Sequence, residues 1–200
     1  MSLRTYIRKQ LKLIASESRI SSVAIGEIEA LLINALEKVV MNAIVIKMNC
    51  RKRTVEARDI EASVKVSLPS EISKYGRSRA LKAYTRYNAT TVHPKGTSRS
   101  TKAGLDIPVS IVENMIRSMV ADNEEKGLRV SDESGVYAGG VLQYLTIELL
   151  EVSLHEADKE NKKTITDTIV VNAVKKDIDL GELFHCRYFE PSRMDFVVCN

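Results

Sequence analysis

The spacing of apolar residues predicts a chain made of helices. Ile7, Leu11 and Ile14 stand at positions i, i+4 and i+7, which is the period of one face of an amphipathic helix. Ser21 and Ser22 are natural N-caps, and the helix that they precede is long, at about 26 residues or roughly 40 Å. The predicted helices of the first half cover residues 5–14, residues 23–48, a stretch through Ile60, Val64 and Leu68 that Pro69 ends, and residues 70–87.

The same order of elements returns in the second half. Pro108 suits the first turn of a short helix, and a polar loop to Ser134 separates this helix from a second long helix over residues 136–158. A short helix around Ile169 closes this half. Between the halves, residues 88–101 mix Thr, Ser, Pro and Gly without apolar periodicity, so we expect a linker there.

A basic loop follows the long helix in each half. Lys52-Arg53-Thr54-Val55 in the first half recurs as Lys162-Lys163-Thr164-Ile165 in the second. One such tetrapeptide on its own would in most cases be a solvated surface turn, but its return at the same place in both halves favours a shared role. The internal repeat therefore predicts an all-α protein of two related units, each built as short helix, loop, long helix, basic loop and short helix.

Composition agrees with a helical protein and limits how the chain could bind an anionic partner. Trp is absent and the chain has only four Pro and nine Gly, as expected where tight turns are few. Charge is uneven, because residues 1–96 contain 18 Lys and Arg against 8 Asp and Glu, whereas residues 97–200 contain 12 against 18. A net charge of only +4 argues against indiscriminate coating of a polyanion, so contacts with an anion would have to be local.

Several motifs resemble those of the histone fold. In residues 6–88 they are similar to core histone 2B, and in residues 98–184 to core histone 2A. The 2B-like motifs are Arg19-Ile20-Ser21-Ser22, Arg53-Thr54-Val55, Leu68-Pro69-Ser70-Glu71 and Lys82-Ala83-Tyr84-Thr85-Arg86-Tyr87, and the 2A-like motifs are Val136-Tyr137, Val141-Leu142-Gln143-Tyr144-Leu145-Thr146 and Asn161-Lys162-Lys163-Thr164. Two such units in one polypeptide resemble the histone doublets of marseillevirus-type giant DNA viruses.

The resemblance implies a domain plan and a way of pairing. Residues 1–88 would form the 2B-like histone fold with its carboxy-terminal helix, residues 89–101 the linker, residues 102–184 the 2A-like histone fold, and residues 185–200 a docking tail. Histone folds pair head to tail in a handshake, which sets the first loop of one unit beside the second loop of the other. We therefore expect the two folds to pair within this chain.

The resemblance also implies a protein that wraps double-stranded DNA without reading its sequence. Each meeting of two loops would bind phosphate, and a third site would lie where the two short first helices converge, so that roughly 30 base pairs are bent per chain. The predicted DNA-binding residues are Arg19, Ser21, Ser22, Lys162, Lys163 and Thr164 at one loop pair; Arg51, Lys52, Arg53, Thr54, Lys126 and Arg129 at the other; Arg4, Arg8, Lys9 and Arg117 at the third site; and, in addition, Arg99 and Lys102.

In this family, other chromatin proteins bind an acidic surface of the histones. The present sequence retains only part of that surface. Gln143, Ile178 and Arg79 stand where acidic residues would be expected. A solvated acidic face without a binding role is an equally good interpretation of what remains. The residues of this acidic patch are Glu71, Glu148, Glu151, Asp177 and Asp179.

Surplus apolar residues predict a protein partner. Apolar side chains surround the end of the first long helix, although an amphipathic helix needs only one apolar face. All three Phe residues of the chain lie close to its carboxy-terminal end, which is a poor composition for a solvated tail. We expect a histone 4–3 type doublet, or equivalent histones, to cover both regions; packing of the tail on its own chain is the alternative. The predicted interface residues are Ile44, Val45, Ile46, Met48, Phe189, Phe196 and Val197.

Other kinds of site have weak support. His185, Cys186 and Cys199 lack a fourth ligand at a recognised spacing, so we expect no metal and no cofactor. The sequence has no set of nucleophile, base and orienting group, so we do not expect an enzyme. Gly139-Gly140 is interpreted as a site of close helix packing. The competing hypothesis is a histone-fold module that binds proteins and wraps little DNA. The resemblance implies a virion and a viral factory as its location, with nuclear chromatin as the alternative.

Overall fold

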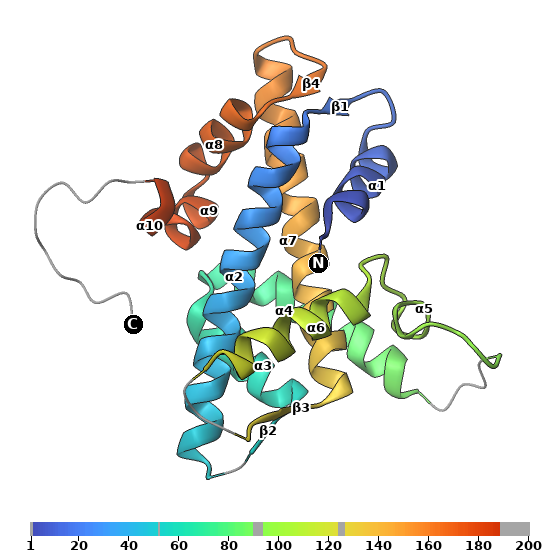
Figure 1. Cartoon of the computed structure of the whole chain (residues 1–200). Helices are drawn as coiled ribbons and strands as arrows, with labels where there is room; N and C mark the ends of the chain where they lie inside the picture. Colours follow the sequence, from blue (N-terminus) through green and yellow to red (C-terminus); the bar gives the residue numbers. More distant parts are fainter. Residues whose placement is uncertain (1, 52, 90–93, 124–126, 189–200) are drawn as a thin grey trace, which may run out of the picture.

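Two long helices lie against each other with opposite chain directions at the centre of the computed structural model (Figure 1). The structure describes residues 2–51, 53–89, 94–123 and 127–188. Helix α2 spans Ser22–Asn49 and helix α7 spans Asp132–Lys159, each with 28 residues. Their equal length and their corresponding places in the two halves confirm the internal repeat.

Helix α7 begins earlier than the predicted start at Val136. Its N-cap is Ser131, whose Oγ accepts a hydrogen bond from the backbone N–H of Ser134 at 3.3 Å. Asp132 and Glu133 lie in the first turn, where negative side chains stabilise the positive end of the helix dipole. The polar loop predicted up to Ser134 therefore ends earlier than its composition suggested.

Shorter helices flank the two long ones. In the first half these are α1 (Arg4–Ile14), α3 (Ala57–Ser67) and α4 (Ser70–Asn88), and in the second half α6 (Val109–Ala121) and α8 (Asp167–Lys176). Helix α4 packs along α7, so it joins the two halves. The segment predicted as a linker ends in a short helix, α5 (Arg99–Ala103), and two further short helices follow α8, namely α9 (Ile178–Leu183) and α10 (His185–Tyr188).

Two short parallel strand pairs join the halves head to tail. Strand β1 (Arg19–Ile20) pairs with β4 (Thr164–Ile165), with Arg19 opposite Thr164. Strand β2 (Thr54–Val55) pairs with β3 (Arg129–Val130), with Thr54 opposite Arg129. The first loop of each half thus lies beside the second loop of the other, as the handshake requires.

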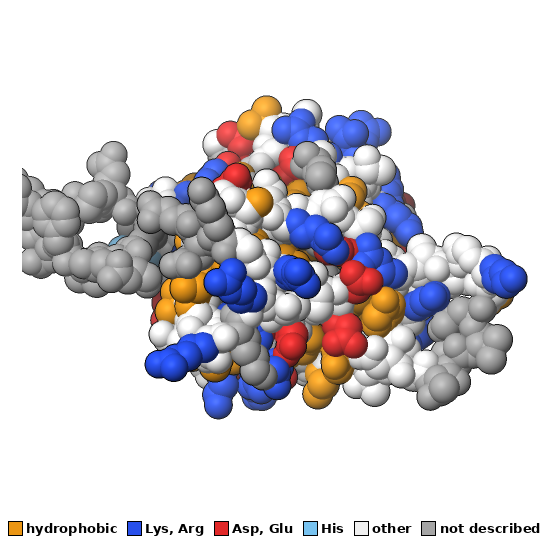
Figure 2. All heavy atoms as spheres, turned by 60° about the horizontal axis from the view of Figure 1, so that its bottom comes forward, with side chains coloured by type: hydrophobic (Ala, Val, Ile, Leu, Met, Phe, Trp, Pro, Cys, Tyr) orange, Lys and Arg blue, Asp and Glu red, His pale blue; other side chains and the backbone are white. Residues whose placement is uncertain are grey.

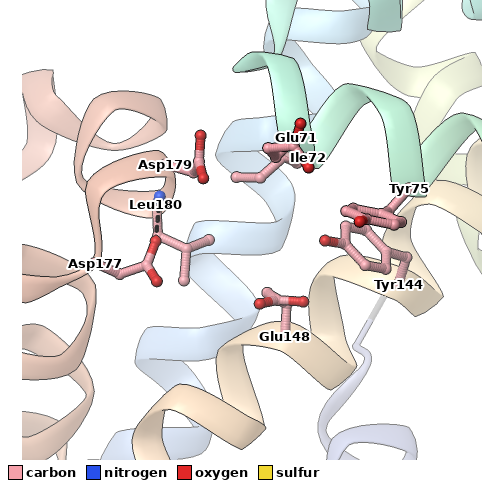
Figure 3. A pocket seen from close by; sticks show the side chains of 8 residues that line it. All are labelled: Glu71, Ile72, Tyr75, Tyr144, Glu148, Asp177, Asp179 and Leu180. Carbon is pink, nitrogen blue, oxygen red and sulfur yellow. Dashed lines mark hydrogen bonds between the residues drawn. The ribbon is translucent and has the colours of Figure 1, made fainter.

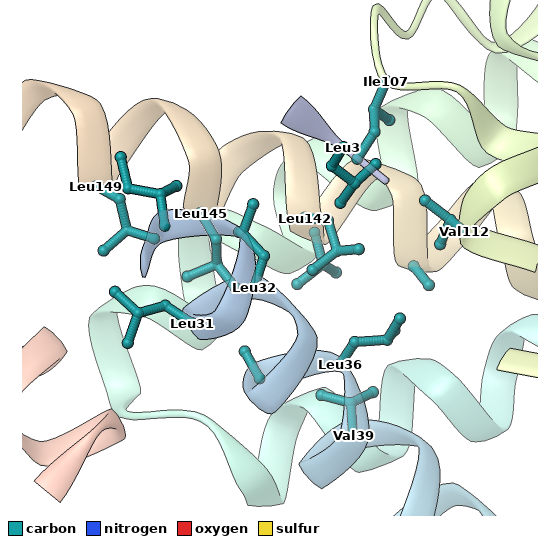
Figure 4. Packing of buried hydrophobic residues seen from close by; sticks show 14 of the residues in the cluster. Leu3, Leu31, Leu32, Leu36, Val39, Ile107, Val112, Leu142, Leu145 and Leu149 are labelled. Carbon is teal, nitrogen blue, oxygen red and sulfur yellow. The ribbon is translucent and has the colours of Figure 1, made fainter. Parts of the chain in front are cut away.

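Both halves contribute to one continuous apolar core (Figure 4). Leu31, Leu32 and Leu36 of α2 meet Leu142, Leu145 and Leu149 of α7, and all six side chains are buried. Burial of this kind contributes on the order of 1.5–3 kcal/mol for each large aliphatic side chain. The long helices of the two halves therefore bury apolar side chains against each other.

The structure confirms the close packing predicted at Gly139-Gly140 and corrects one predicted surface residue. A Cβ at Gly140 would lie 2.5 Å from the Cα of Ala80, so α4 and α7 touch at backbone distance there. Ile44 was predicted to lie on an outer face of α2, and this is wrong, because only 3% of its surface is exposed. It faces the core that the two halves share.

Candidate nucleic-acid interface

The β1·β4 loop pair is built by backbone hydrogen bonds between the two halves. The N–H of Arg19 donates to the carbonyl of Lys163 at 2.9 Å, and the N–H of Ser21 donates to the carbonyl of Ile165 at 2.9 Å. Ser21 is the N-cap of α2, and its Oγ accepts from the N–H of Ala24 at 3.0 Å. Its hydroxyl hydrogen stays available to donate to an anion at the helix start.

The β2·β3 loop pair repeats this arrangement at the other end of the long helices. The N–H of Arg129 donates to the carbonyl of Arg53 at 2.7 Å, and the N–H of Ser131 donates to the carbonyl of Val55 at 3.0 Å. Ser131 takes the place that Ser21 has in the first loop pair. Ser131 was not among the predicted site residues. The sequence contained the signal, because the shift that takes Lys52 to Lys162 also takes Ser21 to Ser131.

Both basic loops start from the same unusual backbone conformation. Arg51 has a φ of 55° and Asn161 a φ of 53°, which is the left-handed region. These residues occupy equivalent positions in the two halves, shortly after the ends of α2 and α7. The turn lets each basic loop reverse direction and reach the first loop of the other half.

Five basic side chains of the loop pairs are exposed and form no ion pair with a carboxylate in the part of the chain that the structure describes. They are Arg19, Arg51, Arg53, Arg129 and Lys163. Lys162 differs, because its Nζ lies 2.7 Å from Glu160 Oε2. Thr54 and Thr164 are half-buried within their strands, and Lys52 and Lys126 lie outside the described residues. Figure 2 brings the β2·β3 end forward and shows Lys and Arg side chains spread over it, interrupted by acidic ones.

Three of the four cations predicted for the third site are held by carboxylates. Arg4 Nε lies 3.1 Å from Glu29 Oε2, and Lys9 Nζ lies 3.5 Å from Asp106 Oδ1. Arg117 Nε donates to Glu113 Oε1 at 2.9 Å. These carboxylates were not predicted, because the segments that supply most of them lie apart in the sequence from the cations. Arg8 is the one of the four that is exposed without a carboxylate ion pair among the described residues.

Glu113 links Arg117 to one further predicted residue, Arg99. Its side chain is buried, and it binds both Arg99 and Arg117, with Asp132 3.7 Å from Arg99 and 3.6 Å from Arg117. Arg99 therefore has an internal role at the start of α5. Lys102, also predicted to bind DNA, is half-buried on the same short helix.

Four of the five predicted acidic residues gather in one open hollow, here called the acidic hollow (Figure 3). It has a volume of about 440 Å³ and lies between α4, α7 and the start of α9. Burial raises the pKa of Glu148, the neighbouring acids Glu151, Asp177 and Asp179 raise it as well, and a hydrogen bond with Tyr144 opposes them. Glu151 lines an adjacent hollow instead. The acidic hollow is lined by Glu71, Ile72, Tyr75, Tyr144, Glu148, Asp177, Asp179 and Leu180.

The predicted partner residues on α2 separate into buried and exposed ones. Val45 is 56% exposed and Met48 36% exposed, and Met41 continues the same stripe at i−4 from Val45. Ile46 is half-buried, and Ile44 belongs to the core. Phe189, Phe196 and Val197 lie outside the described residues.

The chain's last described helix is held against α2 by one carboxylate. Arg187 Nε donates to Glu27 Oε1 at 3.1 Å, and the hydroxyl of Tyr188 also binds Glu27. Burial would raise the pKa of Glu27, but the hydrogen bonds from Arg187 and Tyr188 outweigh burial and lower it. This contact fixes the point from which residues 189–200 continue.

Metal-ligating side chains do not cluster in the described part of the chain. Within it, no three His, Cys, Asp or Glu side chains are placed to hold a metal ion. Nor does any helix among the described residues have the length and apolar character needed to cross a membrane.

Comparisons with known proteins point to one family. No protein-family model matches the sequence. Histone H2B.v1 of Dictyostelium discoideum is 25% identical over 194 residues, which are 90% of this chain and 84% of that protein. Histone 2A-IV of Volvox carteri is 32% identical over 98 residues, 49% of this chain and 72% of that protein. Histone 2A of Trypanosoma cruzi is 40% identical over 87 residues, and the chain spans 61% of its length.

A solved structure shares the fold. The crystal structure of the histone from Methanopyrus kandleri aligns with a TM-score of 0.56 and 17% identity, covering 92% of this chain and all of that one. At this identity the likeness shows the fold alone. It agrees with two histone folds paired within one chain.

Proposed function

Because this chain belongs to the core histone family and joins a 2B-like and a 2A-like histone fold, we propose that it packages double-stranded DNA by wrapping it in a nucleosome-like particle. The observation that carries the proposal is the pair of β1·β4 and β2·β3 loop sites at opposite ends of the long helices. Each brings exposed cations and a helix-capping serine together from both halves. Such groups bind phosphate without reading bases.

The charge pairing within the chain suggests how the bound duplex is held. Arg19, Arg53, Arg129 and Lys163 have their full charge available for phosphate, whereas Arg4 and Arg117 first have to be shared with carboxylates. The two loop pairs then supply most of the binding, and the third site between them contributes less. Inward-facing minor grooves recur about every 10 base pairs, so the three sites together bend roughly 30 base pairs.

A closed particle would need a second histone-type protein, and we propose a 4–3 type doublet or equivalent histones. The exposed stripe of Met41, Val45 and Met48 on α2 supports this. A row of exposed apolar side chains is typical of a protein–protein interface, and another histone fold packed on it would remove this apolar surface from water. Residues 185–200 were expected to form a second docking segment; because Arg187 and Tyr188 bind Glu27 of α2 in the same chain, residues 189–200 are proposed for this role. The protein would act in chromatin, either in a nucleus or in a viral factory and virion.

Digestion of reconstituted complexes by micrococcal nuclease tests the proposal. We expect the chain with its histone partner to protect DNA fragments of one discrete length, independent of sequence. A stable complex with the partner that leaves the DNA unprotected would refute wrapping and favour a protein-interaction module. The variant Arg53→Ala with Lys163→Ala serves as the internal check, since it should reduce protection without changing the protein complex.

A further inference from the structure

A second hollow lies beside the acidic one, with the opposite charge. It has a volume of about 150 Å³, is lined by α4, α5 and α7, and is here called the basic hollow. Arg79, Lys82 and Arg86 provide its charged side chains, and no Asp or Glu lines it. Among the described residues, no carboxylate forms an ion pair with these three cations.

The remaining groups of the basic hollow also suit an anion. Gln143 uses its side-chain carbonyl to accept the backbone N–H groups of Asp106 at 2.8 Å and Ile107 at 3.2 Å, so its amide NH₂ is the part left to bind a ligand. Gly104 has a φ of 67°, and a Cβ at this position would collide with the guanidinium of Arg86. The cation thus sits directly on the backbone turn that ends α5. The free side-chain polar groups are donors, which fit a carboxylate.

The acidic and basic hollows open along one seam, between α4 and α7. Tyr75 and Tyr144 line the first hollow, whereas Arg79, one helical turn after Tyr75, and Gln143, next to Tyr144, line the second. Residues that recur every three or four positions form one face of α4. Along about 22 Å of helix, the charge of this face changes from negative at its start to positive at its end. This face consists of Glu71, Tyr75, Arg79, Lys82 and Arg86.

We propose that two copies of this chain dock through the α4–α7 seam, each placing its acidic hollow against the basic hollow of the other. A two-fold axis between Ser78 and Arg79 would set Glu71 of one copy opposite Arg86 of the other, and Tyr75 opposite Lys82. Such a contact is isologous, so every attraction is made twice. Glu71 is shared with Lys74 of its own chain at 3.6 Å, so Asp179 and Glu148, which form no ion pair with a described residue, supply the remaining carboxylates at each end.

Charge complementarity favours a second copy over the other anions that could enter the basic hollow. A DNA strand or an acidic peptide lying along the seam would meet the carboxylates of Glu71, Glu148 and Asp179 next to the cations. A second copy instead satisfies both hollows at once. This contact between two copies forms without DNA, so it can be tested independently of the packaging function.

The association should be weak and sensitive to salt. Exposed ion pairs each contribute little and are screened by ions, so we expect a dissociation constant on the order of 100 µM to 1 mM at low salt. This is a contact that forms where the protein is concentrated, and it is compatible with a monomer in dilute solution.

Sedimentation equilibrium of the full chain without DNA, at about 50 mM and about 500 mM NaCl, tests the proposal. The wild type should dimerise at the lower salt and dissociate at the higher. The variant Lys82→Glu with Arg86→Glu and the variant Glu71→Lys with Asp179→Lys should each weaken self-association by at least about tenfold. A mixture of these two variants should associate again, because their surfaces are then complementary in charge. The matched control, Lys65→Glu with Lys95→Glu, makes the same change in net charge as the first variant at exposed positions outside the seam and should dimerise like the wild type.

Three results would overturn the proposal. The first is a wild type that stays monomeric at low salt up to millimolar concentration. The second is a mixture of the two reversed variants that fails to associate although both have the wild-type helical content by circular dichroism. The third is a loss of about two units in the salt slope of DNA binding for Lys82→Glu with Arg86→Glu, which would assign the basic hollow to the DNA path.

Discussion

At the scale of single residues, a cation that already forms an ion pair with a carboxylate contributes less free energy to phosphate binding than an unpaired one. Arg53 and Arg4 are both exposed arginines on the expected DNA side. Arg4 is held by Glu29, whereas Arg53 has no carboxylate ion pair in the described part of the chain. A phosphate that approaches Arg4 competes with an existing ion pair, so its net gain is smaller.

This difference leads to a prediction for DNA binding. Arg53→Ala with Lys163→Ala removes one free cation from each loop pair and should lower the slope of log K against log salt by about 2, equally for unrelated sequences. Arg4→Ala with Arg117→Ala should lower it by less. Fluorescence anisotropy over a salt series measures both, with Lys65→Ala and Lys95→Ala as the control. An unchanged slope for the first pair would remove the loop sites from the DNA interface.

The glycine pair in α7 gives a second prediction at this scale. Gly140→Ala puts a Cβ 2.5 Å from the Cα of Ala80, so α4 must move, and we expect a loss of about 1–3 kcal/mol in the free energy of unfolding. Gly139→Ala meets side-chain atoms only at 3.4 Å and gains helix propensity, so it should be close to neutral. Urea unfolding of both variants checks this, and equal stabilities would contradict the backbone contact.

At the scale of elements, one carboxylate fastens α1 to α2. Glu29 Oε1 accepts the backbone N–H of Leu3 at 2.6 Å and the hydroxyl of Ser2 at 2.8 Å, and Arg4 binds the other oxygen. Burial would raise the pKa of Glu29, but these hydrogen bonds outweigh it and lower the pKa. The helix start is therefore stabilised by the ionised form.

The sign of this shift predicts a dependence on pH. A lowered pKa in the folded state means that the stabilisation is present above the unfolded value of 4.5 and is lost as the pH falls through the folded value. At pH about 7, Glu29→Gln should be less stable than the wild type by about 1–2 kcal/mol. The gap should close below pH 4.5, as followed by urea unfolding at several pH values. A gap that is constant with pH would show that charge is not its cause.

At the scale of the whole molecule, the handshake partner is already part of the chain. Both halves share one core and two strand pairs, so no apolar face of the handshake is left for a second copy. We expect a folded monomer at micromolar concentration and about 500 mM NaCl, where the seam contact is screened. Light scattering measures this, and an obligate dimer under these conditions would contradict an intrachain handshake.

Assembly with a histone partner gives the last prediction. Val45→Asp with Met48→Asp changes exposed residues of α2 and should leave the chain folded while preventing a full particle with the partner doublet. Ile44→Asp should instead unfold the chain, since it puts a charge in the core. Sedimentation of the assembled mixture separates these outcomes, and truncation after Tyr188 tests the docking segment. Full particles with the first variant would place the partner interface elsewhere.

The sequence by itself determined the elements and their pairing. Helix ends follow from local rules, as at Ser21 and Pro69, and the return of the basic loop in the second half predicted two related units. The resemblance of their motifs to the histone fold then implied which loops would meet. The tertiary structure decided what depends on neighbours from distant segments. Glu29 and Glu113 occupy cations that the sequence left free, and rotation of α2 on the core buries Ile44 while exposing Val45. Whether a side chain is buried and which ion pairs it forms depend on residues from distant segments that pack around it. A local sequence pattern does not include those residues.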